Sequence, residues 1–218
     1  MSASAGNRGT GRKACVVLGT IAAVVLLSVS AVNAQGSFTD KRDGKKYRTV
    51  KIGKQTWMAE NLNYKTVESV CYDNEESNCQ EYGRLYDWDD AMKACPAGWH
   101  LPSDDEWWVL TDFVGGKKTA GTKLKSKTGW FADKYMDKGY KAATDDYGFS
   151  ALPGGVGYSD GSFDIAGSNG GWWSATASDA NYAWGRYMDY NLEGVGRNGL
   201  DKSFLFSLRC SQDFAVPR

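Results

Sequence analysis

Apolar and polar residues alternate in several short segments of the chain, and each such segment predicts a half-buried strand. Between residues 38 and 58 the pattern predicts successive strands, with a hairpin turn at Asp43-Gly44. Val50 and Ile52 flank Lys51, as in a strand with one buried face. Glycine-rich turns separate further predicted strands, at residues 149–152, 156–158, 172–175, 182–188 and 203–210. In the last of them we expect one face to enter the core, formed by Phe204, Phe206, Leu208 and Cys210.

Two segments show helical spacing. Residues 87–95 begin with the capping residue Asp87, stop before Pro96, and carry an apolar face of Trp88, Ala91, Met92 and Cys95.

A second helix is predicted to start at Ser103, which forms a capping box with Glu106. Its apolar stripe contains Trp107, Leu110 and either Phe113 or Val114. Gly115-Gly116 is expected to end it, and residues 65–83 and 117–148 are predicted as polar loops.

The first 34 residues are predicted to form a signal peptide. Basic residues precede an almost continuous apolar run at residues 14–32, and Val32-Asn33-Ala34 then provides a small-x-small cleavage site. The alternative is an uncleaved membrane anchor, because the run is close to membrane-spanning length. Residues 35–218 are expected to form a single domain with no further membrane span.

Cleavage would change both the charge and the cysteine count. It removes Arg8, Arg12 and Lys13, so that 23 basic residues stand against 26 acidic ones and the net charge is −3. This balance argues against a nucleic acid partner, which usually requires a basic face.

The four remaining cysteines, Cys71, Cys79, Cys95 and Cys210, predict two disulfides in an exported chain. Three pairings are possible, and four free buried thiols are the alternative. A bond between Cys71 and Cys79 could close the local loop, and Cys210 is expected to point inward, where it could meet the end of the first helix.

Side chains that could carry chemistry have simpler structural interpretations. His100, the only histidine, lies in a bend between the helices without a serine or cysteine partner, so we expect it to donate to the backbone.

Acidic loop residues could supply oxygen ligands, but their spacing matches no calcium loop and favours turns. They are Asp145, Asp146, Asp160 and Asp164. Residues 154–157 lack the lysine and helix of a phosphate loop. The sequence therefore implies no metal and no cofactor.

Aromatic residues in or beside loops are the best candidates for ligand binding, because flat aromatic faces stack on sugar rings and anchor protein interfaces. They are Trp130, Tyr135, Tyr140, Tyr158, Trp172 and Trp173. The alternative is that most of them fill the core. Since Trp172 and Trp173 are adjacent on a predicted strand, we expect one to be buried and the other to face solvent.

Several motifs together resemble the Fibrobacter succinogenes major paralogous domain, a family of exported bacterial proteins whose biochemical role is largely unassigned. The resemblance covers about residues 38–213 and rests on residues 57–62, 82–86, 91–103, 106–107, 148–155, 173–175 and 208–210. The most distinctive of these motifs is Cys95-Pro96-Ala97-Gly98-Trp99-His100-Leu101-Pro102.

This family is similar in plan to the C-type lectin-like fold and to the formylglycine-generating enzyme fold. The resemblance implies an α+β, C-type lectin-like domain with two helices, short antiparallel strands and long irregular loops. It also favours the pairs Cys71–Cys79 and Cys95–Cys210, the second matching the long disulfide of lectin-like domains. The Glu-Pro-Asn, Gln-Pro-Asp and Trp-Asn-Asp motifs of calcium-dependent lectins are absent, as is the late cysteine pair that formylglycine-generating enzymes use with copper.

We therefore expect an exported, non-catalytic module that binds a glycan, a cell-surface component or a protein. Its location would be extracellular, at the cell surface or periplasmic. The alternatives are an enzyme with a metal-dependent or oxygen-dependent site in the loops, and a structural component of a secreted surface layer. The sequence leaves the ligand, the compartment and the oligomeric state open.

Overall fold

The computed structural model of the protein describes residues 1–3, 35–131 and 142–213. Contacts divide the chain into two units, Met1–Ala31 and Val32–Arg218, and the helices and strands of the described residues belong to the second. The predicted signal peptide falls almost entirely outside the described residues, so it stays a prediction. Within the described ranges, no helix combines the length and apolar character that a membrane crossing needs.

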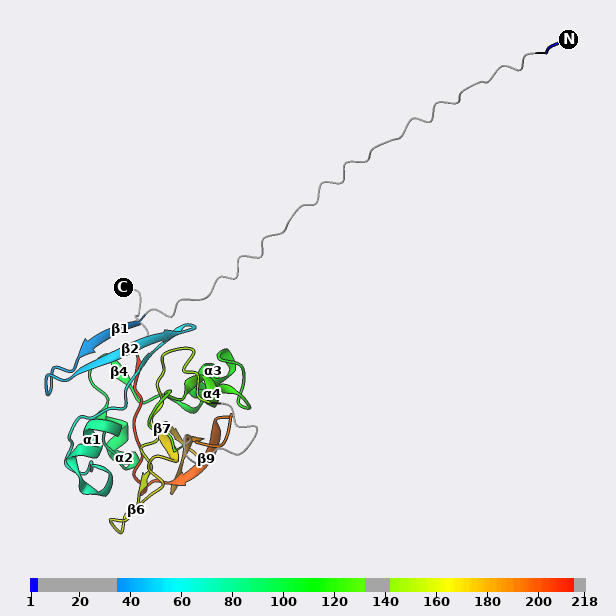
Figure 1. Cartoon of the computed structure of the whole chain (residues 1–218). Coiled ribbons are helices and arrows are strands. Elements are labelled where there is room, and N and C mark those ends of the chain that lie inside the picture. The colour runs from blue at the N-terminus through cyan, green and yellow to red at the C-terminus, as the bar shows by residue number, and fades with distance from the viewer. Residues whose placement is uncertain (4–34, 132–141, 214–218) are drawn as a thin grey trace. The chain divides into compact units, whose positions relative to one another are not determined.

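The largest sheet has five antiparallel strands in the order β1-β2-β3-β10-β4 (Figure 1). These strands are β1 (Gln35–Thr39), β2 (Lys46–Ile52), β3 (Gln55–Met58), β10 (Ser211–Gln212) and β4 (Trp99–His100). The strands predicted between residues 38 and 58 are confirmed, and Gly44 in the turn has a φ of 77°, which glycine adopts without strain. Because β10 lies between β3 and β4, the end of the described chain is built into the interior of the sheet.

A second antiparallel sheet consists of β7 (Asn169–Ala177), β8 (Tyr182–Asp189) and β9 (Gly196–Asp201), and β5 (Val156–Gly157) pairs with β6 (Phe163–Asp164). The sequence pattern did not predict β9, whose glycines and asparagine are weak strand formers.

Two segments predicted as strands are not regular strands. Residues 149–152 and 203–210 form only isolated bridges, such as Tyr86 with Phe206 and Lys125 with Ala151. Phe206 and Leu208 are buried as predicted, and so are Ser207 and Arg209, which point to the opposite face. The last segment is therefore covered on both faces.

Both predicted helices are present with the caps that the sequence indicates. The Asp87 carboxylate accepts a hydrogen bond of 2.8 Å from the backbone N–H of Asp90 at the start of α2 (Trp88–Ala94). Ser103 and Glu106 form the capping box of α3 (Asp104–Phe113).

The apolar faces of these helices differ slightly from prediction. In α3, Trp107 and Leu110 are buried, as is the C-cap residue Val114, whereas Phe113 is 52% exposed. In α2, Met92 is 45% exposed, because the buried face is centred on Ala91 and Ala94. The buried face of α2 is therefore rotated away from Met92 and toward Ala94.

The expectation of only two helices is wrong. The predicted loop at residues 65–83 contains the 3-10 helix η1 (Tyr72–Asn74) and α1 (Glu76–Tyr82), and α4 (Ala120–Leu124) lies in the second predicted loop. Neither α1 nor α4 has a side-chain cap, and α1 buries only Cys79. Because α1 has almost no apolar face and α4 has only five residues, neither helix leaves a clear periodic signal in the sequence.

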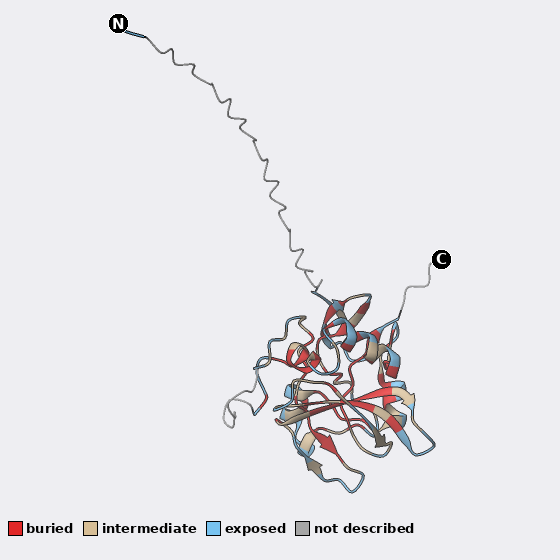
Figure 2. Cartoon of the chain, turned by 90° about the vertical axis from the view of Figure 1, so that its right-hand side faces the viewer, coloured by how far each residue is buried: buried red, intermediate tan, exposed pale blue. Residues whose placement is uncertain are grey.

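Buried side chains form two clusters, and β7 contributes to both. Trp172 packs with Trp57 and Trp107, whereas Trp173 packs with Tyr86 and Leu208. Figure 2 shows the buried residues gathered in the interior of the folded unit and the exposed ones toward its outside. The protein is thus a mixed α and β structure, mostly sheet, with few helices.

Candidate functional site

Residues from several separate sequence motifs contact one buried arginine, Arg209. Arg209 is fully buried, and its Nε donates a 3.0 Å hydrogen bond to Oδ1 of Asn61. Nε1 of Trp172 donates to the same oxygen at 2.9 Å. The two terminal nitrogens of Arg209 donate to the backbone carbonyls of Met58, Phe149 and Ser150.

Burial lowers the pKa of Arg209 to about 9. The motifs at residues 57–62, 148–155 and 208–210 therefore meet around a buried cross-link. Its donors all point at internal acceptors, which makes this cluster part of the framework and not a ligand site.

His100 also serves the framework, but not as predicted. Its ring nitrogens each lie 2.7 Å from a carboxylate oxygen, Nδ1 from Asp213 and Nε2 from Glu106, so the expected donation to the backbone is wrong. Glu106 also accepts from the backbone N–H of Ser103 in the capping box. The side chain of His100 therefore joins β4 to α3 and to the end of the described chain.

Burial alone would lower the pKa of His100, but its hydrogen bonds to Glu106 and Asp213 outweigh burial and raise that pKa above its ordinary value. Because a carboxylate lies beside each ring nitrogen, the positively charged imidazolium form is favoured. Within the described residues, the ring has no hydroxyl or thiol partner.

The candidate aromatic residues do not form an exposed row. Trp130, Trp172 and Trp173 are buried, so the expectation that one of the adjacent pair faces solvent is wrong. The pair does point in opposite directions, but a core cluster covers each face. Tyr158 is half-buried and packs edge-on against Phe204, with 5.1 Å between ring centroids. Tyr135 and Tyr140 lie outside the described residues.

The acidic loop residues mostly behave as turn formers. Asp160 accepts from both the backbone N–H and the hydroxyl of Ser162, and Asp145 does the same for Ser150. Asp164 accepts from the backbone N–H of Ile165.

Both expected disulfides are present, Cys71–Cys79 and Cys95–Cys210. Within the described residues, the one group with the spacing of a metal site is Cys71, Glu76 and Cys79. Since its two sulfurs are bonded to each other, they are not available as thiolate ligands.

A groove next to the short disulfide is the best candidate site. We call it the α1 groove, since α1 forms one wall, while the start of β2 and residues 60–63 form the others. Its volume is about 390 Å³. The lining side chains are almost all polar or aromatic: Lys45, Lys46, Tyr47, Arg48, Glu60, Asn61, Asn63, Gln80, Glu81 and Tyr82, together with Cys79, Gly83 and Leu152.

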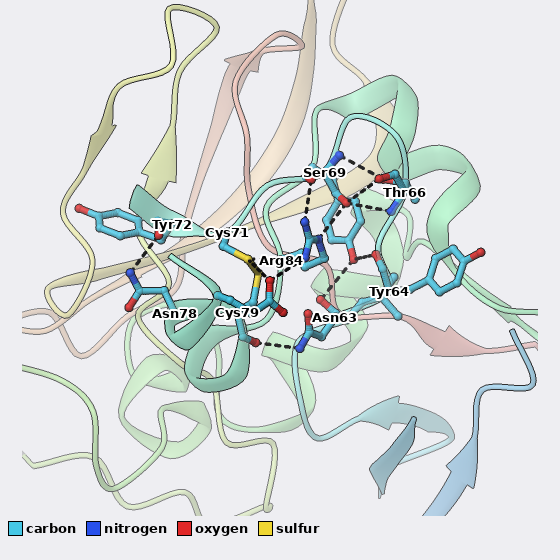
Figure 3. Close-up of a disulfide and its surroundings, with 12 residues drawn as sticks. Asn63, Tyr64, Thr66, Ser69, Cys71, Tyr72, Asn78, Cys79 and Arg84 are labelled. Carbon is cyan, nitrogen blue, oxygen red and sulfur yellow. Dashed lines mark hydrogen bonds and ion pairs between the residues drawn. A yellow bond between two sulfur atoms is a disulfide. The ribbon is translucent and has the colours of Figure 1, made fainter. Parts of the chain in front are cut away.

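Hydrogen bonds fix the walls of this groove to one another. Nδ2 of Asn63 donates to the carbonyl of Cys79 at 2.8 Å (Figure 3). Nδ2 of Asn61 donates to the carbonyl of Tyr82 at 2.7 Å. The ammonium of Lys45 donates to the carbonyl of Asn63. Gly83, with a φ of 79°, ends α1 in a conformation that favours glycine. The groove is therefore preformed.

Arg84 supports the same wall from behind. It is buried, and its Nε and Nη2 donate at 3.0 Å to the hydroxyl and carbonyl of Ser69 (Figure 3). Its Nη1 lies 3.5 Å from Sγ of Cys71 and 3.8 Å from the carboxylate of Glu76. Arg84 thereby ties the disulfide and the start of α1 to Ser69.

The groove is lined by positively and negatively charged side chains as well as by neutral hydrogen-bonding groups. Nε of Arg48 lies 3.2 Å from the carboxylate of Glu60. Burial, followed by a hydrogen bond to Glu81, raises the pKa of Tyr82 to about 12. Its hydroxyl is neutral, as a tyrosine hydroxyl ordinarily is, and can accept a hydrogen bond as well as donate one. Sequence reasoning missed this site because its lining comes from three separate polar segments. The available signal was the sequence Glu60-Asn61 within a family motif.

A family model described as the Fibrobacter succinogenes major domain matches residues 50–212. Comparisons with curated proteins and with solved structures find no match. The matched residues begin within β2 and end at β10, and they include the segments at 60–63 and 79–83 that line the α1 groove. Because the match covers most of the chain, the protein belongs to the Fibrobacter succinogenes major domain family.

Proposed function

We propose that the protein is an exported, non-catalytic binding module whose α1 groove holds a carbohydrate. The observation that carries this proposal is a preformed hollow of about 390 Å³ lined by hydrogen-bonding side chains. This size suits a small ligand or a short stretch of a polymer.

The chemistry of the lining supports a sugar over an apolar ligand. Sugar hydroxyls both donate and accept, and the groove supplies an amide from Gln80, a neutral phenol from Tyr82 and charged groups of both signs. The ring of Tyr82 adds an aromatic surface of the kind on which sugar rings stack. A long apolar ligand would leave these polar groups without partners.

A non-catalytic role is supported by the surroundings of His100. Both of its nitrogens are engaged by carboxylates from Glu106 and Asp213. A general base needs a free nitrogen beside the group that it activates.

Export is supported by the two disulfides, which form and persist in oxidising compartments. We further propose a C-type lectin-like plan for the fold. Two observations support it: Cys95–Cys210 joins the end of α2 to the closing segment, and the first and last described strands share one sheet.

The test is binding of the purified, oxidised protein to a panel of neutral oligosaccharides. We expect Tyr82→Ala to weaken the best ligand about fivefold or more, because a stacked ring contributes roughly 1–3 kcal/mol. Tyr82→Phe, which keeps the ring, is expected to lose less. Gln80→Ala tests the amide, since Gln80 is exposed on α1.

Tyr182→Ala is the matched control, because Tyr182 is 43% exposed on β8 and lies outside the groove. Thermal unfolding must show that every variant is folded. The proposal fails if the folded protein binds no neutral sugar, or if Tyr82→Ala and Tyr182→Ala behave alike.

A further inference from the structure

A cluster with two arginines and one carboxylate lies outside the α1 groove. We call it the Arg197 site; it contains Asp104 at the start of α3, Trp184 and Arg186 on β8, and Arg197 on β9. Nη1 of Arg186 lies 2.6 Å from Oδ1 of Asp104. Nε of Arg197 lies 2.9 and 3.1 Å from the two oxygens of the same carboxylate.

The cluster carries one uncompensated positive charge. Burial alone would raise the pKa of Asp104, but hydrogen bonds from Arg197 and Arg186 lower it, so that the carboxylate is ionised. One negative charge then faces two guanidinium groups. The neighbouring acid, Asp105, is exposed and forms no ion pair with either arginine in the described part of the chain.

The two arginines differ in access to solvent. The side chain of Arg186 is 1% exposed, and its Nη2 also donates to the backbone carbonyl of Asp104. The side chain of Arg197 is 30% exposed. Its Nε donates to Asp104, whereas its terminal Nη1 and Nη2 have no acceptor among the residues that the structure describes.

The exposed guanidinium is also held in place. Its Cζ lies 3.3 Å from the ring centroid of Trp184, and its Nε is held by both oxygens of Asp104. Trp108 lies beneath Arg186, with 5.2 Å between Cζ and the ring centroid. A positioned guanidinium loses little side-chain freedom when it binds, which favours a second, external acceptor.

We infer that Arg197 binds the carboxylate of an acidic sugar, a uronate, through its two terminal nitrogens. The fork of Nη1 and Nη2 matches the two oxygens of a carboxylate, and the excess positive charge favours an anion. The sugar part of this inference rests on the proposed carbohydrate-binding function. The acidic group is recognised by residues that do not line the α1 groove.

Calorimetry at low salt tests this with a uronate trisaccharide and its carboxyl-reduced, neutral counterpart. The unmodified protein is expected to prefer the uronate about tenfold or more, as one charge-assisted, bidentate contact allows. Arg197→Ala and Arg197→Lys are both expected to abolish this preference, because lysine keeps the charge but not the fork. Asp104 still pairs with Arg186 in these variants, so the fold is expected to persist.

Lys93→Ala is the matched control, since it removes one exposed positive charge from α2. It is expected to leave the preference for the uronate unchanged. The inference is overturned if the unmodified protein shows no preference, if Arg197→Lys keeps it, or if Lys93→Ala loses it as well. Equally tight binding of poly-glutamate would overturn the assignment to a sugar.

The outcome for the α1 groove is separate. Tyr82→Ala is expected to weaken neutral sugars and to leave the Arg197-dependent preference for the uronate intact. If the protein binds neutral sugars but the Arg197 variants keep the preference for the uronate, only this inference is overturned. If the protein prefers the uronate but binds no neutral sugar, only the proposal for the α1 groove is overturned.

Discussion

At the scale of single residues, the amide of Asn61 joins parts of the chain that are far apart in sequence. Its Oδ1 accepts from Trp172 and Arg209, and its Nδ2 donates to the carbonyl of Tyr82. The same side chain therefore holds the core and one wall of the α1 groove.

Replacing Asn61 by alanine is expected to lower the free energy of unfolding by about 3 kcal/mol, because two buried donors lose their acceptor. Asn61→Asp keeps an acceptor oxygen and is expected to cost less. Urea unfolding measures both, with the exposed Asn181→Ala as control. A loss in Asn61→Ala no larger than that of the control would contradict this role.

The pKa of His100 should make stability depend on pH. Since its pKa is raised in the folded protein, the folded state binds the proton more tightly than the unfolded state. The resulting stabilisation is complete below about pH 6.5 and is lost as the pH rises through the folded-state pKa.

His100 is the only histidine, so NMR resolves its titration directly. The midpoint is expected above 6.5, and Asp213→Asn is expected to lower it, whereas the exposed Asp112→Asn serves as control. A midpoint at or below 6.5 in the unmodified protein would show that the two carboxylates do not stabilise the imidazolium.

The paired tryptophans show what residue patterns can and cannot predict. Alternation along a strand correctly places Trp172 and Trp173 on opposite faces. It cannot show that each face is covered, because the covering residues, such as Trp57 and Leu208, come from distant parts of the chain. The α1 groove was missed for a related reason, since its walls meet only in the folded protein.

At the scale of elements, local signals were predicted best. Caps at Asp87 and Ser103 and the turn at Gly44 are contained within a few residues, and the structure confirms them. The helix α1 has no cap and almost no buried face, and a disulfide, Gly83 and Arg84 hold it instead. These contacts depend on partners that sequence periodicity does not reveal.

At the scale of the whole molecule, the two disulfides should contribute unequally to stability. Cys95–Cys210 spans a sequence separation of 115, and Cys71–Cys79 spans only 8. In the chain-entropy model, the longer loop corresponds to about 5 kcal/mol and the shorter one to about 2–3 kcal/mol.

Replacing each pair by alanines tests this difference by urea unfolding. We expect the Cys95→Ala, Cys210→Ala variant to lose more stability than the Cys71→Ala, Cys79→Ala variant. The second variant is expected to keep its core while α1 loosens, with a matching loss of affinity in the α1 groove. An equal loss of stability in both variants would show that loop length does not decide their contributions.

The position of β10 has a consequence for how the protein is made. During synthesis, β3 and β4 emerge long before Ser211 and Gln212, the residues that bridge them. The sheet therefore has a gap in its middle until nearly the whole matched domain has left the ribosome. Contacts between distant segments form slowly, so the sheet should close only once synthesis of the matched domain is nearly finished.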